Sequence, residues 1–290
     1  LIVLYYGHKF YMRYNKKCTI EKLKEIFNML YDYHMHCSFS ADSKTPMKDM
    51  IEQSINLNLK EICFTDHVDY DIIGNPNVKI DYNRYFEELN AYKEKYKDRI
   101  SIKKGLEMGL QPHLLERCSK EIKEHDFDFV ICSIHTIDRN ELYTRDYHKG
   151  KTLYEAYEGY YKILFDIVNS YNDYSVLGHL DLIKRYDTTI LEDKLFIDYI
   201  EAILKKVIEN GKGIELNTSS FRYNLPDLMP STNILKLYKE LGGEIITVGS
   251  DSHTTEQIAT KFDYVNEALK DLGYKYTCRF NKMKPEFVKL

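Results

Sequence analysis

Six of the ten histidines in this 290-residue chain stand at or directly after the end of a predicted strand. Carboxylates occupy similar positions, and imidazole nitrogens combined with carboxylate oxygens are ligands that Zn, Mn and Fe accept. The sequence therefore predicts a metal site built without thiolates. The candidate ligands are His34, His36, Asp42, His67, Glu107, His135, His179, Asp251 and His253.

The motif His34-Met35-His36 opens this series. Side chains two apart on an extended strand point to the same side, so both rings can bind one ion. Two ordinary strand histidines would give the same motif, and only the other candidate ligands favour the metal. Asp42 follows in the next loop and offers an oxygen ligand, although an aspartate there is also typical of a turn or a helix N-cap.

Glu107 and the pair Asp251 and His253 follow strands that are mostly apolar. A carboxylate buried at such a position costs free energy unless it is paired or binds a metal, and a glutamate that bridges two ions would satisfy this requirement. Taken singly, His135 or His179 fits a packed core or loop position as well. Together the ligands exceed what one ion coordinates, which predicts two or three divalent ions (Zn, Mn or Fe).

Two arginines that follow predicted strands, Arg185 and Arg222, indicate phosphate. A guanidinium binds two phosphate oxygens at once, and Ser219 adds a hydroxyl donor, although either arginine alone fits a surface ion pair equally well. A multinuclear metal centre activates a bridging water to hydroxide and shields the charge on a transferring phosphoryl group. These residues together predict hydrolysis of a phosphomonoester.

Three residues are predicted to act in the reaction itself. His67 and His253 are expected at the reacting centre, where they also bind metal. The leaving alkoxide must be protonated, and Asp181 or a metal-bound water are the candidate acids.

A repeated order of strand and helix is expected to position these side chains. Apolar or β-branched runs predict strands at 30–36, 61–67, 101–107, 127–135, 174–181, 213–219 and 244–253. Helical spacing predicts helices at about 46–58, 83–97, 112–124, 153–171, 191–210, 231–241 and 255–271. Strict alternation favours a parallel sheet, and seven repeats favour a single-domain α/β barrel, (β/α)7, with its site at the C-terminal ends of the strands.

Composition excludes several function classes. The net charge of -4, with both signs intermixed, argues against nucleic-acid and membrane partners. Six scattered cysteines without a CxxC pair predict reduced thiols, and the lack of a signal-like segment or a long apolar run predicts a cytoplasmic protein. Residues 29–290 are predicted to form the barrel, and residues 1–28 an extension that is either disordered or contains a short helix. The sequence leaves open whether the protein forms a homo-oligomer.

The motifs HxH, TDH, GLE, SIH, GH and SDSH, in this order, closely resemble the polymerase and histidinol phosphatase (PHP) family over roughly residues 30–290. The resemblance implies a distorted seven-stranded barrel with a trinuclear metal centre. Carried over by motif, one ion would be held by His34, His36, Glu107 and Asp251. A second would be held by Asp42, His67 and His253, and a third by Glu107, His135 and His179. Asp42 stands where many relatives have a histidine.

Within this family, the stretches GLEMG, GHLDLIKR and ELNTSSFR resemble the histidinol-phosphatase branch. That resemblance implies hydrolysis of L-histidinol phosphate to L-histidinol and phosphate, in histidine biosynthesis, with the phosphate on Arg185, Ser219 and Arg222. One alternative is a phosphoesterase that acts on another phosphomonoester, such as a nucleotide or phosphotyrosine. A non-catalytic metal-binding module is the alternative from another class.

Overall fold

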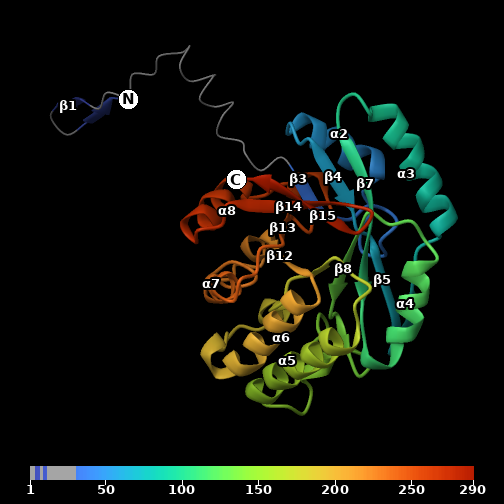
Figure 1. Cartoon of the computed structure of the whole chain (residues 1–290), viewed down its shortest axis with the longest axis vertical. Coiled ribbons are helices and arrows are strands. Elements are labelled where there is room, and N and C mark those ends of the chain that lie inside the picture. The colour runs from blue at the N-terminus through green and yellow to red at the C-terminus, as the bar shows by residue number, and fades with distance from the viewer. Residues whose placement is uncertain (1–3, 7–8, 12–30) are drawn as a thin grey trace.

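The computed structural model describes residues 4–6, 9–11 and 31–290 (Figure 1). The first two ranges form a small antiparallel pair, β1 (Leu4–Tyr6) and β2 (Lys9–Tyr11). No strand is predicted there from sequence. The expected disorder or short helix within residues 1–28 otherwise lies outside the described residues.

Seven parallel strands form a nearly closed barrel in the order β13-β12-β11-β8-β7-β4-β3. At the C-terminal ends of β13 and β3, two backbone hydrogen bonds bridge the remaining gap: His36 donates to Ser252 at 2.8 Å, and Asp251 donates to His34 at 2.7 Å. The predicted α/β barrel is therefore confirmed. Its strands are β3 (Tyr31–Met35), β4 (Glu61–Phe64), β7 (Ser101–Gly109), β8 (Phe129–Ser133), β11 (Val176–Leu177), β12 (Gly213–Asn217) and β13 (Ile246–Gly249).

Helices surround the strands, as Figure 1 shows, and each lies where helical spacing predicts one. The largest differences are at helix starts: the predicted helix at 255–271 begins with a separate 3-10 turn, Thr255–Gln257, and becomes α-helical only at Phe262. The helices are α2 (Met47–Asn56), α3 (Tyr82–Tyr96), α4 (Leu115–Lys123), α5 (Leu153–Ser170), α6 (Ile197–Glu209), α7 (Thr232–Glu240) and α8 (Phe262–Asp271).

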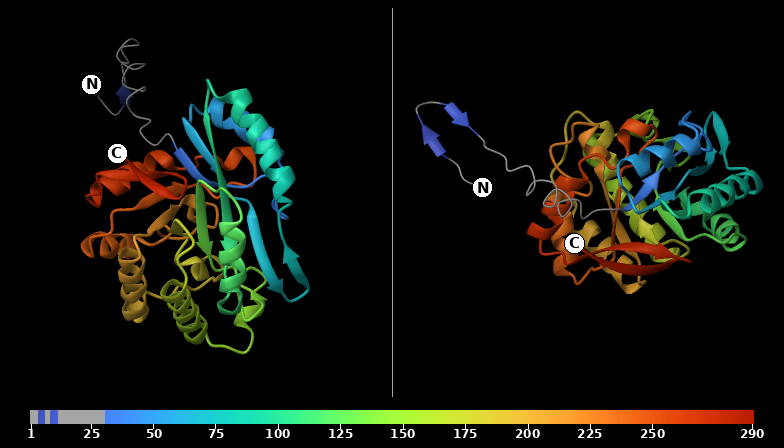
Figure 2. Two further views of the ribbon diagram at one scale, coloured as in Figure 1. Left: turned by 45° about the vertical axis from the view of Figure 1, so that its right-hand side comes forward. Right: turned by 90° about the horizontal axis from the view of Figure 1, so that it is seen from above.

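Besides β1 and β2, three hairpins are absent from the sequence-based prediction. The first, β5 (His67–Ile72) with β6 (Asn75–Val78), runs beside the far half of β7, because β7 continues beyond the end of β4 (Figure 2). The second is the short pair β9 (Thr136–Ile137) and β10 (Asn140–Glu141), directly after His135. The third, β14 (Tyr276–Asn281) with β15 (Lys284–Lys289), ends the chain and packs on β13.

An apolar cluster that includes the last hairpin fills the barrel near the beginnings of its strands. The Tyr33 hydroxyl accepts a hydrogen bond from the backbone of Phe280 at 2.8 Å and donates to Glu61 at 2.5 Å. We call this cluster the apolar plug. Its buried members are Tyr33, Cys63, Phe129, Ile131, Val176, Cys278 and Phe280.

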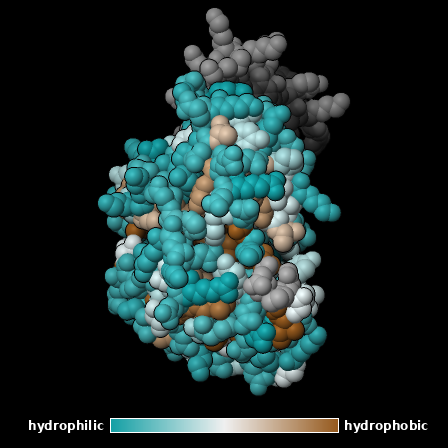
Figure 3. All heavy atoms as spheres, turned by 90° about the vertical axis from the view of Figure 1, so that its right-hand side faces the viewer, coloured by the Kyte–Doolittle hydropathy of each residue, from teal (hydrophilic) through white to brown (hydrophobic). Residues whose placement is uncertain are grey.

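The face of the molecule that carries α3 is largely polar. Figure 3 shows the face that carries α3 as mainly hydrophilic, with hydrophobic residues in separate small areas. Within the part of the chain that the structure describes, no helix has both the length and the apolar character needed to span a membrane. The described cysteines are free and buried.

Candidate active site

The C-terminal ends of the barrel strands surround a cavity of about 490 Å³. Eight of the predicted site residues line it: Asp42, His67, His135, His179, Arg185, Arg222, Asp251 and His253. Four more lie fully buried beneath them: His34, His36, Glu107 and Ser219. Tertiary structure thus brings together every predicted metal and phosphate residue.

Glu107, at the end portion of β7, lies at the centre of the imidazoles. Its Oε2 lies 3.1 Å from His34 Nε2 and 2.9 Å from His67 Nδ1. Its Oε1 lies 3.2 Å from His135 Nε2 and 2.9 Å from His179 Nε2. One fully buried carboxylate therefore faces rings from several strands, which is the arrangement that a bridging ligand needs.

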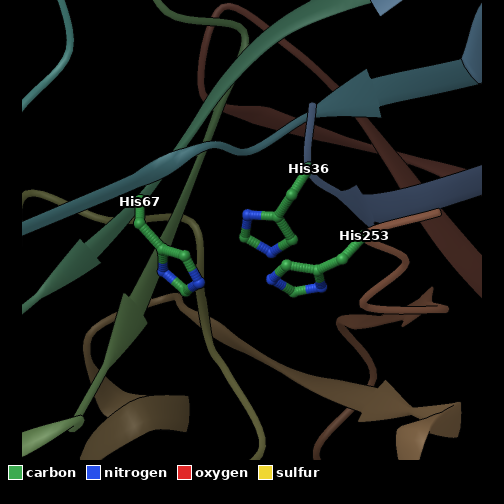
Figure 4. A group of neighbouring side chains, drawn as sticks. All are labelled: His36, His67 and His253. Atoms are coloured by element: carbon green, nitrogen blue, oxygen red, sulfur yellow. The ribbon is translucent and has the colours of Figure 1, made fainter. Parts of the chain in front are cut away.

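His36, His67 and His253 come from three separate segments and gather their rings in one place (Figure 4). The His36 ring stacks on both others, with centroids 4.2 Å from His67 and 4.1 Å from His253. Asp42 reaches the same place, since its Oδ2 lies 3.0 Å from His253 Nε2 and 3.6 Å from His67 Nε2. Ordinary surface histidines do not gather in this way around a carboxylate.

Asp251 lies close to both groups of histidines, those around Glu107 and those that stack on His36. Its Oδ1 lies 3.5 Å from His36 Nε2 and 3.7 Å from His34 Nε2. Within each ligand set that the resemblance implies, the side chains lie close together. His36 and Glu107, however, also lie close to residues of another set. Which residue binds which ion therefore stays a prediction.

Several buried polar atoms at this centre make no regular hydrogen bond among the described residues, and they face only one another or the carboxylates of Asp42 and Asp251. Leaving such atoms unsatisfied is costly, and native proteins rarely do so without a functional reason. Divalent cations would satisfy these atoms, so the residues present fit a metal centre. The atoms are His34 Nε2, His36 Nε2, His67 Nδ1, His253 Nε2 and Glu107 Oε2.

An outer ring of polar groups orients the imidazoles. The Nδ1 atom of His34 lies 2.6 Å from Glu215 Oε1, and that of His135 lies 2.9 Å from Asp69 Oδ1. A hydrogen bond at Nδ1 sets the tautomer and aims Nε2 at the metal position. Sequence reasoning missed Glu215 and Asp69, although a buried carboxylate inside the strand run GIELNTS was a usable signal.

Gly249 permits the contact between His34 and Glu215. A Cβ atom at Gly249 would overlap both the His34 side chain and the Glu215 carboxylate. This glycine at the end of β13 therefore provides the space in which the first imidazole is held.

The electrostatics of the site favour a bound cation. Burial alone raises the pKa of Glu107, but His34, His67 and His135 lower it well below its usual value. Burial and the neighbouring rings of His253 and His67 lower the pKa of His36 well below its usual value. Burial lowers the pKa of His34, His67 and His135, but the neighbouring carboxylates raise it above its usual value, for His67 to about 9. These rings therefore hold protons that bound metal ions would displace.

Arg185, Arg222 and Ser219 lie together next to Asp251. Arg185 Nη2 donates to Asp251 Oδ2 at 2.8 Å and to Ser219 Oγ at 2.5 Å. Arg222 donates to the backbone carbonyls of Ser250 and Asp251, each at 2.6 Å. Two guanidinium groups thus border the candidate metal centre, where phosphate oxygens would need them.

Asp181 is not brought to the cavity. Its carboxylate is fully buried and accepts hydrogen bonds from Lys184 Nζ at 2.8 Å and from the Ser231 backbone at 3.1 Å. Residues that line the cavity do not include it. The prediction that Asp181 protonates the leaving group gains no support from this position.

Fold and site together define a barrel in which side chains that could bind metal cluster beside a pair of arginines. The model of the PHP domain matches residues 32–219. The chain belongs to the PHP domain family.

Individual relatives show which enzymes of this family the chain is similar to. The chain is 32% identical to the histidinol-phosphatase of Lactococcus lactis over 87% of this chain and 95% of that protein. It is 31% identical to a probable histidinol-phosphatase of Clostridium acetobutylicum over 81% of this chain and 90% of that protein. The fold matches the crystal structure of the Lactococcus lactis enzyme, complexed with zinc, L-histidinol and phosphate, with a TM-score of 0.82 at 31% identity, covering 88% of this chain and 98% of that one.

Proposed function

We propose that this chain is a metal-dependent histidinol-phosphate phosphatase, which hydrolyses L-histidinol phosphate to L-histidinol and phosphate. One observation carries the proposal: unsatisfied imidazole and carboxylate atoms converge directly beside Arg185 and Arg222. The similarity to an enzyme whose structure holds zinc, L-histidinol and phosphate supports the choice of substrate.

The proposed metal centre contains two or three divalent ions, with Zn, Mn or Fe as candidates. Zinc gains support from the structure of the Lactococcus lactis enzyme. The ions, when bound, supply Lewis-acid charge and a hydroxide nucleophile at neutral pH. The proposed ligands are those predicted from the sequence: His34, His36, Asp42, His67, Glu107, His135, His179, Asp251 and His253.

The remaining roles belong to side chains of the cavity wall. Arg185 and Arg222 bind the phosphate oxygens and neutralise their charge. Ser219 is the third proposed phosphate contact, and in this structure its hydroxyl accepts from Arg185 and donates to Asn217. Arg185 already contacts Asp251 at 2.8 Å, so the bound phosphate stays within reach of a metal ligand. His67 and His253 border the same space and keep the reacting oxygen atoms in place.

The proposal extends to the setting of the reaction. We place it in histidine biosynthesis, in the cytoplasm, with a small phosphorylated substrate and without a nucleic-acid partner. The barrel domain is assigned to residues 29–290.

The test combines metal analysis with substrate preference. The purified chain is analysed for bound metals, and phosphate release is then measured from L-histidinol phosphate, a nucleoside monophosphate, phosphotyrosine and p-nitrophenyl phosphate. We expect more than one equivalent of divalent metal and the highest kcat/KM for L-histidinol phosphate. A protein that binds metal but prefers another ester would be a different phosphatase, and one without turnover of any ester would be a binding module.

A further inference from the structure

Lys184, the residue before Arg185, belongs to a buried network of three charged side chains. Its ammonium group donates to Asp181 Oδ2 at 2.8 Å and to Asp193 Oδ1 at 2.5 Å. All three side chains are buried, and among the described residues that line the cavity none of the three occurs. The proposed metal and phosphate roles therefore leave this network unused.

Stability alone does not explain why these charges are buried. Burial lowers the pKa of Lys184, but the carboxylates of Asp181 and Asp193 raise it above its usual value, so the ammonium group stays charged. Removing charges from water is costly, and replacing a buried ion network by neutral side chains often leaves stability unchanged or raises it. A fixed geometry is the other role that such networks serve.

The network holds a short turn that its own hydrogen bonds stabilise only weakly. Lys184 and Arg185 lie in the 3-10 helix η3 (Leu182–Tyr186), and 3-10 hydrogen bonds have poorer geometry than those of an α-helix. With three residues per turn, adjacent side chains point about 120° apart. Lys184 thus reaches the buried carboxylates, while Arg185 reaches the cavity.

The start of α7 is the anchor of this network. Ser231, the N-cap residue of α7, donates through its hydroxyl to Asp193 Oδ2 at 2.5 Å. Its backbone donates to Asp181 Oδ2 at 3.1 Å. Both carboxylates that hold Lys184 are therefore held in turn by the same residue of α7.

The segment before α7 is joined to the phosphate side of the site. The Met229 carbonyl accepts a hydrogen bond from the backbone of Asn217 at 2.7 Å. Asn217 Oδ1 accepts from the Ser219 hydroxyl at 2.5 Å, and this hydroxyl accepts from Arg185 Nη2 at 2.5 Å. Arg185 is thus connected to α7 by two routes, one through Ser219 and one through Lys184.

We propose that Lys184 is a positioning residue for phosphate binding: the buried network holds η3 against the start of α7 and so keeps Arg185 within reach of the bound phosphate. The inference rests on the proposed function, since this phosphate belongs to the proposed substrate and product. Lys184 does not touch the ligand and acts through Arg185. Its loss should weaken phosphate binding and leave the metal content unchanged.

The experiment measures the binding of inorganic phosphate to the zinc-loaded chain by calorimetry, so that the result does not depend on turnover. Lys184→Met removes the ammonium group but leaves two buried carboxylates unpaired, which is destabilising. A neutral variant therefore combines Lys184→Met with Asp181→Asn and Asp193→Asn, whose amide oxygens can still accept from Ser231. We expect both variants to bind phosphate about 10-fold more weakly than wild type, because a displaced guanidinium loses charge-assisted hydrogen bonds.

A double-mutant cycle tests whether Lys184 acts through Arg185. In a chain that carries Arg185→Ala, the same substitutions should change phosphate affinity by about twofold or less, because the effects of residues that act through one contact are not additive. Lys205→Met is the matched control, since it removes the same charge on α6, where the side chain is 55% exposed. Metal content and melting temperature are measured for every variant.

Unchanged phosphate affinity in the folded neutral variant, or an equal loss with and without Arg185, would overturn the role of Lys184 and leave the phosphatase assignment intact. A neutral variant that does not fold would assign the network to stability and would also overturn this role. A wild-type chain that binds phosphate but does not hydrolyse L-histidinol phosphate would instead contradict the proposed substrate, and the binding data would still decide the role of Lys184.

Discussion

The two ends of the barrel differ in whether their buried polar atoms are paired. At the beginnings of the strands, the apolar plug is buried and its polar atoms are paired, as with the Tyr33 hydroxyl between Glu61 and Phe280. At the C-terminal ends, buried atoms of His34, His36 and Glu107 lack hydrogen-bond partners within the described chain. The comparison teaches that one end stabilises the fold, whereas the other holds polar groups ready for a ligand.

Substitutions at the metal end are expected to have the largest effect on activity. His135→Ala and His253→Ala should each lower kcat/KM by about a thousandfold or more, since metal ions contribute several kcal/mol to transition-state stabilisation. Phosphate release and metal content are measured in parallel. The control is His113→Ala, whose side chain is 47% exposed and paired only with Asp71. A metal-loaded, folded variant with near-wild-type turnover would contradict the site.

Truncation in the apolar plug should affect stability instead. Phe280→Ala removes a buried ring and is expected to lower the free energy of unfolding by about 3–5 kcal/mol, measured by denaturant unfolding. The matched control on the neighbouring strand is Phe287→Ala, because this ring is 50% exposed and its loss should change stability by about 0.5 kcal/mol or less. At a temperature where both variants are folded, kcat/KM should stay near that of wild type. A large loss of activity in folded Phe280→Ala would contradict the view that the apolar plug supports stability but not activity.

The outer ring around the metals is expected to give an intermediate effect. Glu215→Gln keeps the volume but weakens the contact that orients His34, and such changes typically cost about 10- to 100-fold in metal affinity or activity. Titration with Zn and steady-state kinetics measure the two quantities. Glu209→Gln is the control, because it removes the same charge at the end of α6, where the side chain is 66% exposed. Unchanged metal affinity together with unchanged kcat/KM would show that Glu215 does not position the ring.

Substitution of Asp181 is expected to have the smallest effect, measured as the preference between two substrates. Asp181→Asn is expected to keep the ratio of kcat/KM between L-histidinol phosphate and p-nitrophenyl phosphate within about twofold, because its carboxylate is bonded to Lys184 away from the cavity. A general acid would matter far more for the alkoxide leaving group than for nitrophenolate. A selective loss on L-histidinol phosphate would therefore support the original assignment of Asp181.

Prediction from sequence worked best where local periodicity is strong. The apolar stripe before Gly211 predicted a helix at 191–210, and the structure has a 3-10 turn followed by α6 in this range. The hairpin of β5 and β6 was missed because its edge position depends on pairing with the extended β7, which local patterns do not report. The C-terminal hairpin was missed for the same reason, since its burial depends on β13 and Tyr33.

The amino-acid sequence by itself determined which side chains stand at the strand ends, because alternation along each strand is a local property. It thereby predicted the candidate metal and phosphate residues. Only the tertiary structure decided their partners: Glu215 contacts His34 from 181 positions away, and the backbone of Ser231 donates to Asp181 from 50 positions away. Such contacts depend on the closure of the barrel and on burial, which no local spacing in the chain records.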